Sequence, residues 1–184
     1  MAIDLPDDVR GAMGELIAQL KPLCKDVRWT RAEIIHVTLK FIGEVDAAKA
    51  DSIRAALAPI QSNAPVDMRF RGVGFFPNGR DPHVVWCGIE ASKNLAELAA
   101  GVETALEPLG IAREQRAFSP HLTLGRLNSA RRTRELVQAA KDLEAREFGA
   151  MHATQFHLFE SFTKPSGAEH RKIQTYSFVK EAAA

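Results

Sequence analysis

His-Val-Thr-Leu at residues 36–39 and His-Leu-Thr-Leu at residues 121–124 are two copies of one short pattern. The copies begin about 85 residues apart, within the apolar runs 34–42 and 117–127. Such runs predict strands, and side chains alternate between the two faces of a strand. The histidine and the threonine of each copy therefore share one face. A single copy is an ordinary strand with a polar face, whereas two copies in matching surroundings indicate a shared function.

The composition is that of a soluble globular protein, large enough for one domain with a real core or for two small lobes that share one. The chain has 184 residues, of which 46% are hydrophobic and 26% charged, and its formal net charge is +1. So small a net charge provides no overall basic field. Any contact with nucleic acid is therefore expected from a local patch.

The location of the protein is predicted from features that the sequence lacks. Residues 1–6 contain neither the basic stretch nor the apolar stretch of a secretory signal, and no run approaches the roughly 18 apolar residues of a membrane span. The two cysteines, Cys24 and Cys87, fit neither a metal motif nor a disulfide framework. We therefore expect a reduced, cytoplasmic protein without membrane contact, and a monomer.

The spacing of apolar residues predicts a chain of alternating strands and helices. Helices are expected after Pro6 and after Asp46, from 95 to 109 and from 130 to 147, with Asp46 as an N-cap. Loops are expected at 77–82 and 164–167. The predicted strands are 2–5, 27–30, 34–42, 66–76, 83–90, 118–127, 151–162 and 173–179.

The two halves of the chain, roughly 1–82 and 83–184, follow one plan of strand, helix, motif strand, helix and further strands. The opening Ala-Ile-Asp at 2–4 corresponds to Gly-Ile-Glu at 88–90, at nearly the same offset as the two motifs. We interpret this plan as an internal duplication that packs about a pseudo-two-fold axis, with or without exchange of strands. It predicts a single bilobal domain in which both His-Thr pairs line the cleft between the lobes.

Two histidines on opposite sides of one ligand suit displacement at phosphorus. An unperturbed histidine pKa of about 6.5 leaves both protonation states available near neutrality. One neutral ring can take a proton from water while a protonated ring gives one to the leaving oxygen, in line across the phosphorus. The pattern therefore predicts His36 and His121 as an acid–base pair. Hydroxyls of Thr38 and Thr123 are expected to bind the non-bridging oxygens.

A nearby cation would offset negative charge in the transition state. Lys40 shares the predicted face of the first motif. Arg126 lies five residues after His121, so strict alternation places it on the opposite face. A bulge or a strand end near Gly125 would be needed to turn Arg126 towards His121.

A metal site is the main alternative for paired histidines. Such a site normally includes a carboxylate or a further histidine at ligand spacing, and neither motif has one. We therefore expect no metal and no cofactor. Of the other histidines, His83 and His170 are interpreted as loop or strand-end residues, and His152 and His157 as structural residues on opposite faces of a strand.

The surroundings of both motifs extend the pattern to nearly the whole chain. Residues 29–44 and the stretch Phe-Ser-Pro-His-Leu-Thr-Leu-Gly-Arg at 118–126 resemble the two-histidine phosphoesterase superfamily. Within it they are most similar to the LigT-like RNA 2′,3′-cyclic phosphodiesterases, historically called 2′-5′ RNA ligases. The likeness includes residues 2–6 and 75–77, the strand around Trp86, and residues 156–161. Together these stretches are specific, whereas one His-x-Thr-Leu alone would be weak.

The resemblance implies a bilobal α+β fold with antiparallel sheets lining a central cleft and helices outside. It also implies metal-independent opening of a 2′,3′-cyclic phosphate at an RNA end to leave a 2′-phosphate. By position, His36 would be the general acid that protonates the departing O3′, and His121 the base that activates water. Thr38 and Thr123 would bind phosphate oxygens, and Arg126 matches the arginine that the family carries after its second motif.

Three alternatives stay open at this point. ATP-independent 2′-5′ joining of RNA ends is the reverse of the same chemistry. A smaller substrate, such as a cyclic phosphate on a nucleotide or on an ADP-ribose derivative, would need the same groups. An RNA-end binding module is the third, but binding alone does not need two titrating groups.

Contacts with the rest of an RNA are less defined by the sequence. The stretch His170-Arg171-Lys172 stands where an aromatic residue is common in the family, so the resemblance does not predict stacking on a base or ribose there. Several arginines are candidates for phosphate contacts, although a solvated helix start explains the last three equally well. The candidates are Arg28, Arg31, Arg80 and the cluster Arg131, Arg132 and Arg134.

Overall fold

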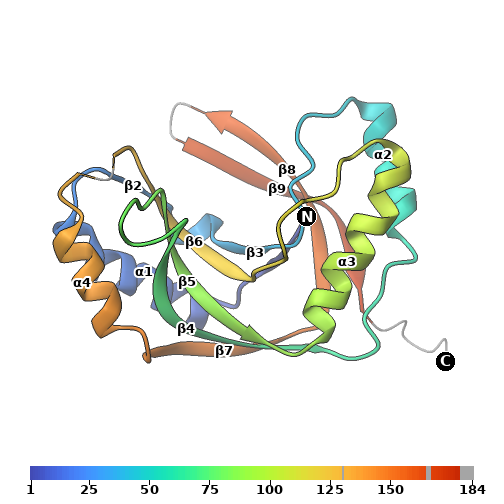
Figure 1. The fold of residues 1–184 in the computed structure, drawn as a ribbon. Helices are drawn as coiled ribbons and strands as arrows, with labels where there is room; N and C mark the ends of the chain where they lie inside the picture. Colours follow the sequence, from blue (N-terminus) through green and yellow to red (C-terminus); the bar gives the residue numbers. More distant parts are fainter. Residues whose placement is uncertain (130, 165–166, 179–184) are drawn as a thin grey trace.

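Two curled antiparallel sheets with helices packed against them form the fold (Figure 1). The computed structural model describes residues 1–129, 131–164 and 167–178. A four-stranded sheet has the order β3-β1-β8-β9, and a five-stranded sheet has the order β2-β6-β5-β4-β7. The strands are β1 (Ala2–Asp4), β2 (Val27–Trp29), β3 (His36–Thr38), β4 (Val66–Phe76), β5 (Val84–Ala91), β6 (His121–Leu127), β7 (Glu147–Ala153), β8 (Gln155–Lys164) and β9 (Gly167–Ser177). The α-helices are α1 (Asp7–Leu20), α2 (Ala47–Leu57), α3 (Asn94–Leu106) and α4 (Arg134–Asp142).

The sheets do not follow the two halves of the sequence. The four-stranded sheet joins β1 and β3 from the first half to β8 and β9 from the second. The five-stranded sheet joins β2 and β4 to β5, β6 and β7. Each sheet therefore takes strands from both of the predicted halves, and the first motif lies in one sheet while the second lies in the other.

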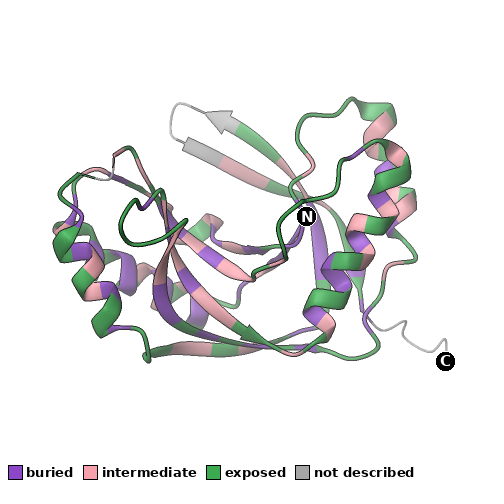
Figure 2. Cartoon of the chain, viewed as in Figure 1, coloured by how far each residue is buried: buried purple, intermediate pink, exposed green. Residues whose placement is uncertain are grey.

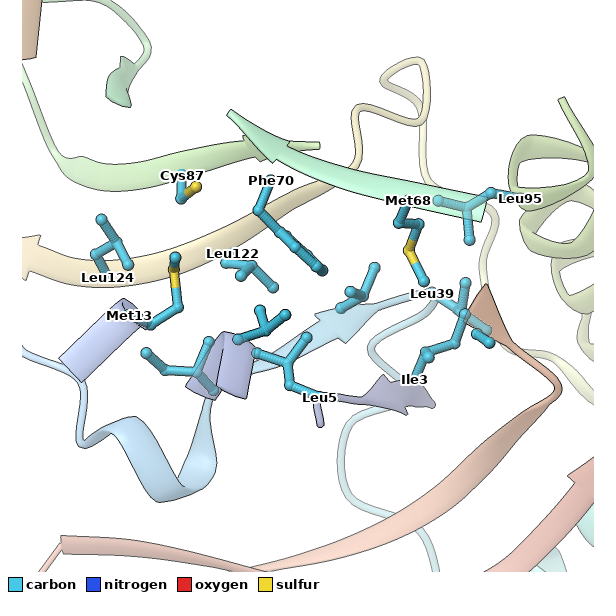
Figure 3. Packing of buried hydrophobic residues seen from close by; sticks show 14 of the residues in the cluster. Ile3, Leu5, Met13, Leu39, Met68, Phe70, Cys87, Leu95, Leu122 and Leu124 are labelled. Atoms are coloured by element: carbon cyan, nitrogen blue, oxygen red, sulfur yellow. The ribbon is translucent and has the colours of Figure 1, made fainter. Parts of the chain in front are cut away.

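One hydrophobic core connects the two sheets (Figure 3). Strand β4 shows how the sequence builds it, because Val66, Met68 and Phe70 are buried while the residues between them are exposed. This alternation is the pattern of a strand with one face on the core. Ile3 from the four-stranded sheet and Leu122 from the five-stranded sheet belong to the same cluster. Packing against this core therefore fixes the relative position of the two motif strands.

Each helix packs by one face, so that in Figure 2 each carries both buried and exposed residues. Helix α1 buries Val9, Met13, Leu16, Ile17 and Leu20, the helical spacing expected of an amphipathic helix. It packs against β7, while α4 packs against β4 and α2 packs against α3. The predicted N-cap of α2 is confirmed, because the carboxylate of Asp46 accepts a hydrogen bond of 2.7 Å from the backbone N–H of Lys49.

The first motif strand is shorter than the predicted 34–42. A 3₁₀ turn (Ala32–Ile34) precedes β3, and the strand ends at Thr38. The backbone N–H groups of the next two residues both turn to the carbonyl of Met1. The strand prediction is therefore wrong beyond Thr38. Phe41, which a strand continued to residue 42 would place on the apolar face with Val37, is 83% exposed.

The predicted helix 130–147 and strand 151–162 are also corrected. Helix α4 covers only Arg134–Asp142, and the chain from Glu147 to Ala153 forms β7 on the edge of the five-stranded sheet. Pairing with β4 satisfies backbone groups of β4 that would otherwise lack partners, which outweighs the helical spacing. The chain then crosses at Thr154 to β8 in the other sheet. Residues 130, 165–166 and 179, on which parts of the predicted elements fall, lie outside the described residues.

Among the described residues, no helix has both the length and the apolar character needed to cross a bilayer.

Candidate active site

The two motifs lie on strands of different sheets that contact each other. Strands β3 and β6 meet near the middle of the molecule (Figure 1). Val37 and Leu122, the residues between histidine and threonine in each motif, are both fully buried in the shared core. Because side chains alternate along a strand, the histidines and threonines face away from that core. We call this side of the two sheets the motif face, defined by His36, Thr38, His121 and Thr123.

Both motif histidines are held in the same way. The Nδ1 atom of His36 lies 2.9 Å from the carbonyl oxygen of Ile34, and the Nδ1 atom of His121 lies 2.8 Å from the carbonyl oxygen of Ser119. A carbonyl oxygen only accepts, so the proton of each neutral ring is on Nδ1. In both cases the carbonyl belongs to the residue two positions earlier. This arrangement leaves each Nε2 free to give or take a proton.

The hydroxyl groups of the motif threonines make no hydrogen bond with the described residues. Neither Thr38 nor Thr123 makes a side-chain hydrogen bond with the part of the chain that the structure describes. Thr38 is exposed and Thr123 is half-buried. Within that part of the chain, both hydroxyls are therefore available to a ligand.

Arg126 shares the motif face because of a bulge in β6. In the pairing of β5 with β6, Val85 is opposite Gly125 but Trp86 is opposite Thr123, so Leu124 is an extra residue. Leu124 and Gly125 are both buried, and Arg126 is exposed. The bulge restores Arg126 to the side of Thr123, as the prediction required.

Lys40 does not reach the motif face, contrary to the prediction. Its ammonium group forms an ion pair of 2.7 Å with Glu103 and donates a hydrogen bond of 2.6 Å to the carbonyl of Ala112. The side chain is only 6% exposed. Because β3 ends at Thr38, the alternation that placed Lys40 beside the first motif does not continue to it. Lys40 is a structural residue here rather than a phosphate ligand.

His36 is surrounded by aromatic rings from the C-terminal hairpin of the four-stranded sheet. The ring of Phe159 is stacked on it at 5.9 Å between centroids, and the ring of His170 meets it edge-on at 5.3 Å. The pKa of His36 is lowered to about 4, mainly by burial. The charges of His170 and of the N-terminal ammonium also lower this pKa, whereas the hydrogen bond to Ile34 and the charge of Asp4 act in the opposite direction. In the free protein His36 is therefore neutral at neutral pH.

Sequence reasoning missed the position of His170. It lies within β9, opposite Ser161 of β8, and its Nδ1 is 2.8 Å from the hydroxyl oxygen of that serine. Its interpretation as a loop or strand-end residue is corrected, because strand pairing with β8 brings it against His36. A signal in the sequence was the resemblance, which marked the stretch His170-Arg171-Lys172 as the place of a common aromatic residue. His157, in contrast, is a structural residue as predicted, 2% exposed and bonded to Thr175.

Asp4 is the acidic group opposite His36. Strand β1 pairs with β3 so that Asp4 and His36 are directly opposite each other. Burial alone would raise the pKa of Asp4, but hydrogen bonds from Lys172 and Arg10 outweigh it, and the pKa is lowered. The carboxylate is therefore ionised near neutral pH, and both cations neutralise much of its field.

The ring of His121 packs against aromatic side chains of the five-stranded sheet, Phe76 and behind it Trp86. The ring of Phe76 meets the ring of His121 edge-on at 4.9 Å, and it lies 5.3 Å from the ring of Trp86. A Cβ atom on Gly74 would lie 2.2 Å from the ring of Trp86, so the indole occupies the space that a side chain would take. The position of Trp86 thus depends on glycine at the residue opposite it.

Burial of His36 predicts an acid-sensitive fold. Its pKa is about 4 in the folded protein, against 6.5 as the ordinary value. Between these two pH values the unfolded chain binds a proton that the folded ring does not, so the free energy of unfolding falls as the pH drops from about 6.5 to about 4. Below that window His36 makes no further difference. His36→Gln should reduce the fall by up to about 3 kcal/mol, measured by urea denaturation across the window.

The same two proteins provide an internal control above this window, at about pH 7.5 to 8.5, where His36 is neutral in both the folded and the unfolded chain. There the stabilities of the wild type and His36→Gln should differ by a constant. Parallel curves within the window as well would contradict the prediction.

Metal ligands do not gather within the described residues. No group of three or more histidine, cysteine, aspartate or glutamate side chains there could hold a metal ion. The arginine cluster lies at the start of α4, with Arg134 as the first residue of the helix and Arg131 and Arg132 just before it. Arg132 and Arg134 border a cavity of about 460 Å³ together with Gly79 and Lys141.

Comparison with known proteins connects this arrangement to one family. The family model described as the 2′-5′ RNA ligase superfamily matches residues 6–161. An Archaeoglobus fulgidus protein named RNA 2′,3′-cyclic phosphodiesterase is 31% identical, over 96% of this chain and 97% of the relative. A Methanocaldococcus jannaschii protein of the same name is 30% identical, over 96% and 98%.

Solved structures share the fold. The crystal structure of the Thermus thermophilus protein TT0787 has a TM-score of 0.79 at 26% identity and covers 96% of this chain and 95% of that one. Escherichia coli LigT complexed with 3′-AMP has a TM-score of 0.77 at 23% identity, with coverage of 97% and 96%. These matches confirm the predicted α+β fold and the resemblance drawn from the two motifs. The chain belongs to the 2′-5′ RNA ligase superfamily.

Proposed function

We propose that this protein opens the 2′,3′-cyclic phosphate at the end of an RNA to leave a 2′-phosphate, without a metal ion. The observation that carries the proposal is the matched pair of histidines. Each Nδ1 is held by a carbonyl oxygen, and each Nε2 is free on the motif face beside a threonine hydroxyl that no described residue engages. The relatives named RNA 2′,3′-cyclic phosphodiesterase support this substrate.

The proposed reaction needs one proton donor and one proton acceptor. His121, as the neutral base, takes a proton from water while the water oxygen attacks phosphorus. The bond from phosphorus to O3′ breaks as His36, protonated on Nε2, gives its proton to O3′. One water is added, and the products are a 2′-phosphate and a 3′-hydroxyl. Exchange of protons with solvent returns both rings to their starting states.

This order of roles requires His36 to gain a proton when the substrate binds. Its pKa is about 4 in the free protein. A phosphate anion next to an imidazole favours the charged ring, and therefore raises this pKa towards neutrality. Thr38 and Thr123 would hold the non-bridging oxygens by hydrogen bonds, and Arg126 would offset their charge.

The test is turnover of a short RNA that ends in a 2′,3′-cyclic phosphate, with excess EDTA. We expect full activity in EDTA, a 2′-phosphate as the product by phosphorus NMR, and a bell-shaped dependence of kcat on pH. A 3′-phosphate product, or loss of activity on chelation that added metal restores, would refute the proposal. RNA binding without turnover would favour the binding module instead.

A further inference from the structure

Arg28 lies beside Arg126 on the motif face. Strand β2 pairs with β6 so that Arg28 is directly opposite Arg126. Both side chains are exposed, whereas Val27 and Gly125 on the other face of the pair are buried. Residues directly opposite in an antiparallel pair share one face. The two guanidinium groups therefore project from the same side as Thr123.

The arginine pair has no counter-charge within the described part of the chain. Among residues 1–129, 131–164 and 167–178, neither Arg28 nor Arg126 makes an ion pair or a side-chain hydrogen bond. The nearest acid in sequence, Asp26, accepts a hydrogen bond of 3.2 Å from the hydroxyl of Ser129 instead. Like charges placed directly opposite each other destabilise a sheet. An anionic ligand that binds both groups would remove this cost.

The geometry of the pair indicates what this ligand is. Thr123, Arg126 and Arg28 form a row that leads away from the motif threonine, first along β6 and then across to β2 at the edge of the sheet. Neighbouring strands lie about 5 Å apart. A row of groups that starts at one phosphate and continues with guanidinium groups suits a chain of phosphates. Arginine is the side chain that binds phosphate through two parallel hydrogen bonds.

We infer that Arg28 binds the phosphodiester group that joins the terminal nucleotide to the rest of the RNA, next to the terminal phosphate at Arg126. This inference rests on the proposed function and refines its substrate. Arg28 then makes the enzyme favour an RNA end over a 2′,3′-cyclic mononucleotide, which lacks that phosphodiester.

The test compares two substrates with Arg28→Ala. One substrate is a trinucleotide that ends in a 2′,3′-cyclic phosphate, and the other is adenosine 2′,3′-cyclic phosphate. The variant should lose about tenfold in kcat/KM on the trinucleotide, the effect of one lost hydrogen bond between charged groups. The loss should be confined to the trinucleotide. Arg28→Lys should recover part of the loss, because lysine keeps the charge but not the paired hydrogen bonds.

The salt dependence provides a second readout that a structural role would not change. Each contact with a phosphate of single-stranded nucleic acid contributes roughly −0.7 to the slope of log affinity against log salt concentration. Binding of the trinucleotide product with its 2′-phosphate should therefore show a slope shallower by about that amount in Arg28→Ala. The matched control is Arg54→Ala on α2, where Arg54 forms a surface ion pair with Asp51. It removes the same charge and should change neither readout.

The possible outcomes separate this inference from the proposed function. Equal losses on both substrates, or no loss on either, would overturn the role of Arg28 while leaving the phosphodiesterase activity established. A wild-type protein that hydrolyses neither substrate would overturn both. An unchanged salt slope together with a trinucleotide-specific loss would also count against a direct phosphate contact.

Discussion

Replacing His121 by alanine is expected to lower kcat on the cyclic-phosphate RNA by about 10²- to 10⁴-fold. The reason is the loss of the Nε2 atom that accepts the proton of water, while all binding groups stay in place. His121 is half-buried on the motif face and its Nδ1 bonds only a carbonyl oxygen, so the core does not change. Single-turnover rates with excess enzyme would measure the chemical step directly, and circular dichroism would check the fold.

His152→Ala is the matched control for this experiment. His152 is an exposed histidine on β7 that pairs with Asp67, and its loss should leave kcat unchanged. If His121→Ala weakened binding of the RNA but kept the rate of the bound complex, the acid–base assignment would be wrong. His121 would then contribute to RNA binding but not to proton transfer.

Replacing Gly74 by alanine is expected to destabilise the protein by about 3 kcal/mol and to reduce activity. The new Cβ atom would lie 2.2 Å from the indole of Trp86, a distance that forces the ring to move. Trp86 contacts Phe76, and Phe76 contacts His121. Displacement of the indole ring should therefore also displace the ring of His121. Urea denaturation gives the stability, and kcat/KM on the RNA gives the effect on the site.

Gly101→Ala is a control in which the same substitution should raise the stability of the protein instead of lowering it. Gly101 lies within α3, where an added Cβ would make only an ordinary contact of 3.9 Å with Ile60. Alanine is the better helix former, so this variant should gain about 0.5–1 kcal/mol. A Gly74→Ala protein as stable as the wild type would show that the indole has room to move.

The sequence predicted the parts of the fold that depend on local spacing. The alternation of Val66, Met68 and Phe70 identified β4, and the helical spacing of apolar residues identified α1. Strand β7 was predicted only over its end, as the start of the strand 151–162. The reason is that Glu147–Ala153 is mostly exposed or half-buried and shows no clear alternation. Its structure comes from pairing with β4, a contact between residues about 80 positions apart. Local pattern does not contain that information.

The site was predicted as far as its two motifs, and no further. The repeated His-x-Thr pattern identified both histidines. Arg126 lies an odd number of residues after His121, which showed that a bulge or strand end near Gly125 would be needed to bring it to the same face. The sequence did not show that β3 ends at Thr38. Because it ends there, Lys40 pairs with Glu103 instead of lying beside the first motif. His170 reaches His36 only through the pairing of β8 with β9, which no local pattern indicates.

The buried ion pair of Lys40 has a consequence for how the protein tolerates changes of length. Lys40 follows the first motif directly, and its ammonium holds both Glu103 and the carbonyl of Ala112, nine residues before His121. The carboxylate of Glu103 also accepts a hydrogen bond from the backbone N–H of Glu114. The segment that follows His36 is thus connected, through Lys40, to the segment that precedes His121. We expect insertions in the loop 77–82 to leave the contacts of Lys40 intact. A single residue added between Ala112 and His121 should instead change the position of the His121 ring relative to the His36 ring.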